Sequence, residues 1–172
     1  DGELTDSEIF MLTVNAVNDA PVIVLPDSFT FDEDETLVEN FNVYLSDVDE
    51  DGLTLTVSDM DSIEVFINEF DVNFYAPVNW FGIDTVTFSV NDNQGRAIAS
   101  DEVNIVVTAV NDVPVITDQT DILTTDEDIP LNITLENLEV VDIDNSYSDG
   151  FDLTILGGEH YTVEGTVITS EL

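Results

Sequence analysis

The sequence predicts an all-β protein that is built from small antiparallel β-sandwiches in tandem. Three observations support this fold class: apolar and polar residues alternate in short runs, turn signals separate the runs, and whole phrases of the chain return later. Hydrophobic residues make up 43% of the 172 residues. This fraction is enough for a folded core, whereas an equally acidic chain with few apolar residues would be expected to stay disordered.

Alternation with a period of two marks the predicted strands. Apolar residues occupy every second position in segments 53–57, 70–74, 86–90 and 103–107. Such a period places one row of side chains in a core. Turn signals such as Asn93-Gln94-Gly95 separate these segments. Short strands at this spacing, without a helical period, indicate an antiparallel β-sandwich of immunoglobulin-like type.

A long repeat divides the chain. Three phrases return in the same order: AVNDAPVI at 16–23 as AVNDVPVI at 109–116, DED at 32–34 and again at 126–128, and DVD at 47–49 as DID at 142–144. A period of roughly 90 to 95 residues is the size of a small sandwich domain and exceeds that of most solenoid repeats. We therefore expect the last strand of a preceding repeat at 1–17, a complete repeat at 18–110 and an incomplete following repeat at 111–172.

The charge balance limits the partners of the protein. Asp and Glu number 39 against one basic residue, Arg96, and the net charge is -38. Nucleic acids and anionic membranes would be repelled over a Debye length of about 8 to 10 Å. Membrane insertion is not expected either, because the sequence has no run of about 18 apolar residues. The absence of cysteine excludes disulfides and thiolate chemistry.

The acidic phrases point to a cation. In DVDEDG, residues 47–52, carboxylates occupy alternate positions before a glycine, and calcium takes six to eight oxygen ligands. An EF-hand is excluded, because its twelfth position would be Ser58 and its flanks are typical of strands. A solvated turn is the alternative for any single cluster. The recurrence of three acidic clusters in a fixed order favours a cation site, whose remaining ligands would come from other segments of the chain.

Together these phrases resemble the cadherin-like tandem repeats of large bacterial surface proteins and adhesins, which are relatives in fold of animal cadherins. The similarity covers essentially the whole chain. Its parts are the linker AVNDAPV or AVNDVPV, the acidic stretch FDEDETL or TDEDIPL, the Asp-x-Asp loop DVDEDGLTLTV, and NWFGIDTVTFSVNDNQG with its Asp-containing exit turn. The resemblance implies a secreted, extracellular or cell-surface location, with calcium and neighbouring repeats as partners.

In cadherins calcium lies between successive domains, so the resemblance implies one site at each linker. The site at the first linker would use Asn18, Asp19, Asp47, Asp49 and Asp92. The site at the second linker would use Glu33, Asn111, Asp112, Asp142 and Asp144. Nothing in the sequence matches the Asp-Arg-Glu segment of cadherins, and one or two ions per joint are therefore expected. The implied function is a non-enzymatic, calcium-rigidified spacer that holds a distal module away from the cell.

Direct adhesion is the alternative function, through carbohydrate or protein. Cell-surface glycans would stack on exposed aromatic rings. The candidates are Trp80, Phe81, Tyr44 and Tyr75, although the phrase around Trp80 predicts packing in a core. Other copies of the chain could exchange strands, but residues 1–17 supply one strand where two are missing.

An enzyme is not expected. The only histidine, His160, is interpreted as an exposed strand residue. Paired carboxylates can serve glycoside hydrolysis, but here they repeat at turns beside Asn and Gly, where a ligand or a solvated loop fits better.

Overall fold

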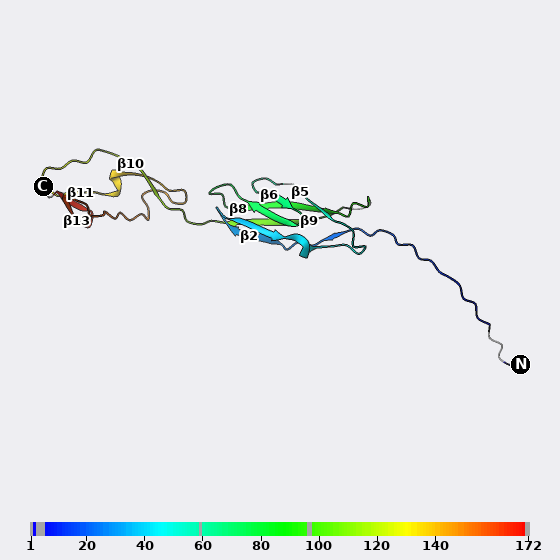
Figure 1. The fold of residues 1–172 in the computed structure, drawn as a ribbon. Helices are drawn as coiled ribbons and strands as arrows, with labels where there is room; N and C mark the ends of the chain where they lie inside the picture. Colours follow the sequence, from blue (N-terminus) through cyan, green and yellow to red (C-terminus); the bar gives the residue numbers. More distant parts are fainter. Residues whose placement is uncertain (1, 3–5, 59, 96–97, 171–172) are drawn as a thin grey trace. The chain divides into compact units, whose positions relative to one another are not determined.

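A computed structural model describes residues 2, 6–58, 60–95 and 98–170, and Figure 1 shows an all-β chain. The predicted fold class is therefore confirmed. The chain consists of two compact units, unit 1 at residues 1–109 and unit 2 at residues 110–172.

Unit 1 consists of two main sheets and one short strand pair. The sheets have the strand orders β2-β9-β8-β5 and β3-β7-β6, and the pair is β1-β4. The strands are β1 (Val22–Ile23), β2 (Ser28–Asp32), β3 (Thr36–Asn40), β4 (Leu45–Ser46), β5 (Thr54–Ser58), β6 (Glu64–Asn68), β7 (Asp71–Tyr75), β8 (Gly82–Asn91) and β9 (Ile98–Thr108).

One strand pair of unit 1 is parallel. Strand β2 runs parallel to β9, with Ser28 opposite Asn104, whereas the other pairs are antiparallel. Parallel neighbours require a crossover connection and cannot form a hairpin. Here almost the whole unit lies between the two strands in sequence, so local alternation could not indicate this pairing.

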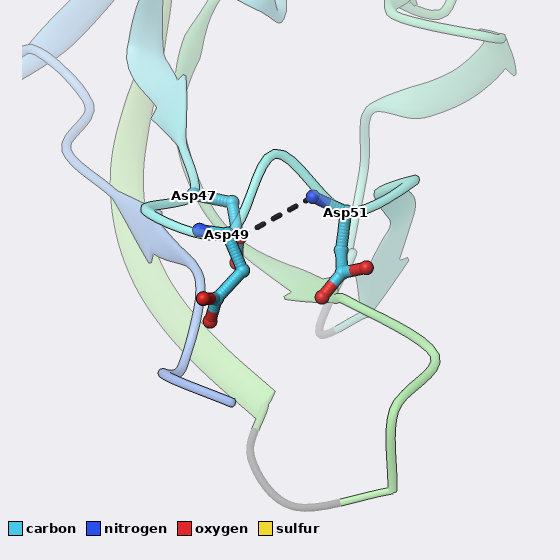
Figure 2. A group of neighbouring side chains, drawn as sticks. All are labelled: Asp47, Asp49 and Asp51. Atoms are coloured by element: carbon cyan, nitrogen blue, oxygen red, sulfur yellow. Dashed lines mark hydrogen bonds between the residues drawn. The ribbon is translucent and has the colours of Figure 1, made fainter. Parts of the chain in front are cut away.

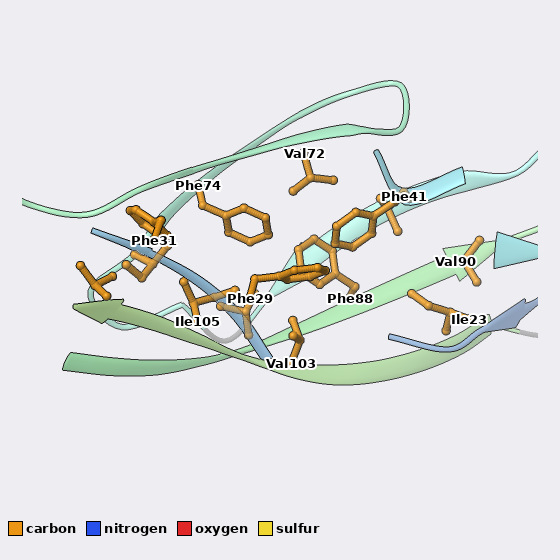
Figure 3. Close-up of a cluster of buried hydrophobic side chains, with 14 residues drawn as sticks. Ile23, Phe29, Phe31, Phe41, Val72, Phe74, Phe88, Val90, Val103 and Ile105 are labelled. Atoms are coloured by element: carbon orange, nitrogen blue, oxygen red, sulfur yellow. The ribbon is translucent and has the colours of Figure 1, made fainter. Parts of the chain in front are cut away.

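The core lies between the two main sheets (Figure 3). Alternate residues of β8, Val86, Phe88 and Val90, are fully buried. The ring of Phe88 lies 6.1 Å from that of Phe74 on β7, in an edge-to-face arrangement. Aromatic pairs at this separation add to the stability gained by burial. The apolar residues at every second position of the sequence are therefore the side chains that point into the core.

A short 3-10 turn, η1 (Phe41–Tyr44), delivers one more ring to this core. The side chain of Asn40 accepts a hydrogen bond of 3.2 Å from the backbone N–H of Asn42 and so caps the turn. Phe41 is fully buried, with its ring 4.6 Å from that of Phe88. The turn thus closes one side of the core.

Unit 2 repeats one strand pair and one three-stranded sheet of unit 1. Strand β10 pairs with β12, as β1 does with β4, and the sheet β11-β14-β13 has the order of β3-β7-β6. Among its described residues there is no counterpart of β8 or β9, and the side chains are half-buried or exposed. The elements are β10 (Val115–Gln119), β11 (Leu131–Asn132), η2 (Leu135–Asn137), β12 (Leu138–Val141), β13 (Tyr161–Glu164) and β14 (Val167–Ser170).

Residues 6–17 form no strand in this structure, and Phe10 is 82% exposed. The sequence expectation was a last strand, and in unit 1 the corresponding strand β9 is held by β2 and β8. No described strand pairs with 6–17, and a last strand of a preceding repeat at 1–17 stays a prediction. Residues 1 and 3–5, which belong to the same expected strand, lie outside the described part.

His160 is exposed, as expected, but the prediction of a strand position is wrong. It lies in a turn, where a bridge joins Gly158 to Tyr161, and its φ is 70°. That left-handed backbone conformation is typical of turns.

Candidate cation site

The acidic loop after β4 folds around one carboxylate. Asp47 Oδ1 accepts hydrogen bonds from the backbone N–H of Asp49, at 2.9 Å, and of Asp51, at 3.4 Å (Figure 2). These bonds turn the loop so that carboxylate oxygens of all three residues lie within 4.8 Å of one another. Carboxylates this close repel, by roughly 1 kcal/mol per pair at 4 Å in water. The loop therefore concentrates negative charge at one point.

The first linker is bonded to this loop. The backbone N–H of Asp19 donates to Asp49 Oδ2 at 2.7 Å, and Asn18 Nδ2 donates to Asp92 Oδ2 at 2.8 Å. Asn18 and Asp92 are 74 positions apart in sequence. The structure thus brings together all five residues that were assigned to the first site: Asn18, Asp19, Asp47, Asp49 and Asp92.

Asp92 contributes a buried negative charge where β8 ends. Its side chain is 1% exposed, and its Oδ1 accepts the backbone N–H of Gln94 at 2.9 Å. The hydrogen bond from Asn18, with that from Gln94, holds the pKa of Asp92 below its ordinary value. Hydrogen bonds to the charged form favour that form. Asp92 is therefore anionic at neutral pH, as a calcium ligand must be.

One oxygen of the cluster lacks a hydrogen bond. Asp47 Oδ2 is buried and accepts no hydrogen bond from the described residues. A buried polar atom in this state is unfavourable unless another group satisfies it. The surrounding donor atoms are oxygens, the type that hard cations such as calcium prefer. The residues present therefore fit a calcium ion.

Two residues near this site were not assigned by sequence reasoning. Asp51 completes the group of three carboxylates, and its Oδ1 accepts a hydrogen bond of 3.0 Å from Gln94 Nε2. The alternate positions of Asp47, Asp49 and Asp51 were the signal for the first of them. Gln94 lies in the exit turn of β8, and only the fold brings it to the loop.

The same bonds recur in unit 2. Asn111 Nδ2 donates to the carbonyl of Asp112 at 2.7 Å, the N–H of Asp112 donates to Asp144 Oδ2 at 2.6 Å, and the N–H of Asp144 donates to Asp142 Oδ1 at 3.0 Å. The equivalent three bonds of unit 1, between the same atom types, are 2.9, 2.7 and 2.9 Å long. Both linkers therefore attach to their Asp-x-Asp loop in one way.

Unit 2 adds residues that unit 1 does not have. Asn145 Nδ2 donates to Asn111 Oδ1 at 3.3 Å and to Asp142 Oδ1 at 3.2 Å. Asp149, whose part in the site the sequence left open, lines the same pocket as these three residues. The longer loop of unit 2 thus places further oxygen atoms beside the linker.

Glu33, assigned to the second site, belongs to unit 1. It is buried, and its backbone N–H donates to the carbonyl of Thr108 at 2.9 Å, where β9 ends. The other four residues of that expected site, Asn111, Asp112, Asp142 and Asp144, belong to unit 2. A site that Glu33 shares with them stays a prediction.

A family comparison assigns the chain. The family model described as the bacterial Ig domain matches residues 18–108, more than half of the chain. The chain belongs to the bacterial Ig domain family. Bacterial Ig domains typically occur in surface or secreted proteins and are not typically catalytic. No described helix is long and apolar enough to cross a membrane.

Solved structures similar to this bacterial Ig domain chain have low sequence identity. An endo-fucoidan hydrolase of glycoside hydrolase family 107 is 19% identical, with a TM-score of 0.46, over 88% of this chain and 24% of the hydrolase. The EC1-4 region of Drosophila N-cadherin is 16% identical, with a TM-score of 0.46, over 90% of this chain and 41% of that one. The chain spans about a quarter of the hydrolase. Among curated proteins, no relative matches.

The aromatic residues of the bacterial Ig domain in unit 1 fall into two groups. Trp80 packs against the core, as its phrase predicted, and the ring of Tyr44 lies 5.6 Å from that of Phe41. Phe81 is exposed, and Tyr75 is 40% exposed. Of the four candidates for sugar stacking, these last two are exposed, whereas Tyr44 and Trp80 are half-buried.

Proposed function

We propose that this chain is a calcium-stiffened spacer of an extracellular surface protein. In this proposal the repeats are those expected from the sequence: a last strand at 1–17, a complete repeat at 18–110 and an incomplete one at 111–172. The observation that carries the proposal is the recurrence, in both units, of the same three hydrogen bonds between an Asn-Asp linker and an Asp-x-Asp loop. Two solvated turns would not be expected to share the same three hydrogen bonds to a linker.

In each unit, hydrogen bonds attach the linker to the acidic loop. In unit 1 the Asp19 N–H anchors the linker to Asp49, and Asn18 anchors it to Asp92. Calcium would supply the positive charge that these carboxylates need when they converge. An Asn18 ligand must come from its Oδ1 or its backbone carbonyl, because its NH2 group is a donor. Extracellular modules bind calcium with dissociation constants of about 10⁻⁴ to 10⁻³ M, which suits a site that fills outside a cell.

The test is a pair of thermal melts, one with 10 mM calcium and one with a chelator. One site of that affinity would stabilise the folded state by about 1.4 to 2.7 kcal/mol, and Tm should rise by roughly 6 to 20 °C. Asp47→Ala and Asp112→Ala should each lose much of this shift, because Asp47 carries the unsatisfied buried oxygen and Asp112 joins the second linker to its loop.

The matched control is Glu102→Ala, which removes one exposed carboxylate of β9 that belongs to neither loop. This variant should keep the calcium shift of the parent chain. An equal shift in all four proteins, or no shift in the parent, would contradict a site at these residues and leave the clusters as solvated turns.

A further inference from the structure

The sheet β3-β7-β6 has an outward face, called here the ring face. Val72 and Phe74 of β7 point into the core (Figure 3), so Asn73 and Tyr75 lie on the opposite side, because side chains alternate along a strand. The pairing is regular across all three strands, without a bulge. The ring face is therefore a regular three-stranded surface.

Two exposed aromatic side chains lie next to each other on the ring face. Val38, Asn73 and Phe66 form one cross-strand row, and Thr36, Tyr75 and Glu64 form the next. Phe66 is 62% exposed and Tyr75 is 40% exposed. They are diagonal neighbours, a relation that places residues about 7 to 8 Å apart and within reach of aromatic side chains. The two rings thus offer adjacent apolar surfaces to solvent.

Polar groups border these rings. Asn73 Nδ2 donates to the backbone carbonyl of Phe66 at 3.4 Å, and the two residues are cross-strand neighbours. A cavity of about 240 Å³ begins at Tyr75, and Glu64 and Ser62 also line it. Amides both donate and accept hydrogen bonds, and carboxylates accept them. Rings and hydrogen-bonding groups therefore alternate over a short distance.

The opposite face of unit 1 has a different chemistry. There the outward side chains of β5, β8 and β9 include Thr56, Ser89 and Ser100, and the hydroxyls of the two serines lie 2.8 Å apart. No aromatic side chain belongs to the outward rows of β2, β9, β8 and β5 among their described residues. The exposed rings of the sandwich faces are thus confined to one side.

We propose that the ring face binds a neutral polysaccharide. Sugar rings would stack on Tyr75 and Phe66 through their apolar C–H faces, and their hydroxyls would bond to Asn73 and Glu64. The net charge of -38 excludes an anionic polymer and makes a second copy of the chain repel the first. Glu64 and Asp71 are the only charged residues on the outward rows of the described strands β3, β7 and β6, so a cationic protein would find two carboxylates on the ring face. This binding does not depend on the calcium site.

The test is affinity electrophoresis in native gels that contain xyloglucan, galactomannan, laminarin or dextran, with alginate as the anionic polymer. At least one neutral polymer should retard the 172-residue chain. Tyr75→Ala and Phe66→Ala should each weaken binding about tenfold, whereas Tyr75→Phe keeps the ring and should stay within about threefold. Thermal melts establish whether each variant is folded. If Tyr75→Ala does not fold, Phe66→Ala alone tests the ring face.

The matched control is Phe10→Ala, which removes an exposed phenylalanine outside the sandwich and should leave retardation unchanged. Three results would overturn the proposal. The first is no retardation by any neutral polymer. The second is equal retardation of the parent chain and the Tyr75→Ala, Phe66→Ala double variant. The third is a dimer in sedimentation that Phe66→Ala abolishes, which would identify the ring face as a contact between copies.

Discussion

At the scale of single residues, buried carboxylates organise the turns of unit 1. Asp84 on β8 is buried, and its Oδ2 accepts backbone N–H groups of Asp61, Ser62 and Ile63 at 3.1, 2.8 and 2.9 Å. Burial alone would raise the pKa of Asp84, but these hydrogen bonds outweigh it and hold the pKa below the ordinary value of 3.8. The ionised side chain therefore fixes the turn that leads into β6.

Replacement of this carboxylate tests its role. Asp84→Asn keeps the shape of the side chain but removes the charge, and hydrogen bonds to a charged acceptor are roughly twice as strong as neutral ones. We expect the variant to lose about 1 to 2 kcal/mol of unfolding free energy at pH 7, measured by urea denaturation.

The pH dependence of that loss has a definite sign. The pKa of Asp84 is lower in the folded than in the unfolded state, so its contribution is complete above about pH 3.8 and is lost as the pH falls through the folded pKa. The gap between parent and variant should therefore shrink on acidification below that pH. A gap of the same size at pH 7 and pH 3 would assign the loss to packing.

At the scale of elements, the turn η1 shows how one short segment serves both core and surface. Phe41→Ala should cost about 3 to 5 kcal/mol, because Phe41 is fully buried and contacts the ring of Phe88. Val43→Ala, in the same turn but at a position that is 76% exposed, should change stability by less than about 0.5 kcal/mol. Urea unfolding of the two variants measures the difference, and similar losses would contradict the burial pattern.

The alternation of apolar and polar residues predicted strands that pair with other strands of unit 1. Segments 53–57, 86–90 and 103–107 overlap β5, β8 and β9, because one buried row marks each of them. The parallel pairing of β2 with β9 has no local signal. Residues 6–17 have a pattern typical of a strand, but a strand also needs a neighbour to pair with, and no described strand pairs with them.

The sequence predicted those residues of the candidate site that belong to repeated motifs. Asn18, Asp19, Asp47 and Asp49 belong to phrases that recur, and the structure joins them by hydrogen bonds. Residues outside the repeat were harder to find. Asn145 occupies a loop that differs in length between the units, so no repeated phrase singled it out.

At the scale of the whole molecule, charge and linker chemistry have to act together. A net charge of -38 opposes compaction of any acidic chain. Monovalent salt weakens the repulsion between all exposed carboxylates without binding at one place. The Asp-x-Asp loops of the two units instead place several carboxylates where one divalent ion can neutralise them. The proposed spacer function therefore requires an effect on the motion of the linker as well as on stability.

Small-angle X-ray scattering can separate these two effects. In the chelated protein, residues such as Asp112 repel the carboxylates of their own loop, and the linker should sample many conformations. Calcium should narrow this range, which lowers the high-angle rise of the dimensionless Kratky plot, and Asp112→Ala should respond less. The melts and the scattering would then agree on one site. If calcium raised Tm but left the scattering of the parent chain unchanged, the ion would stabilise single domains without stiffening the joint, and the spacer mechanism would be wrong.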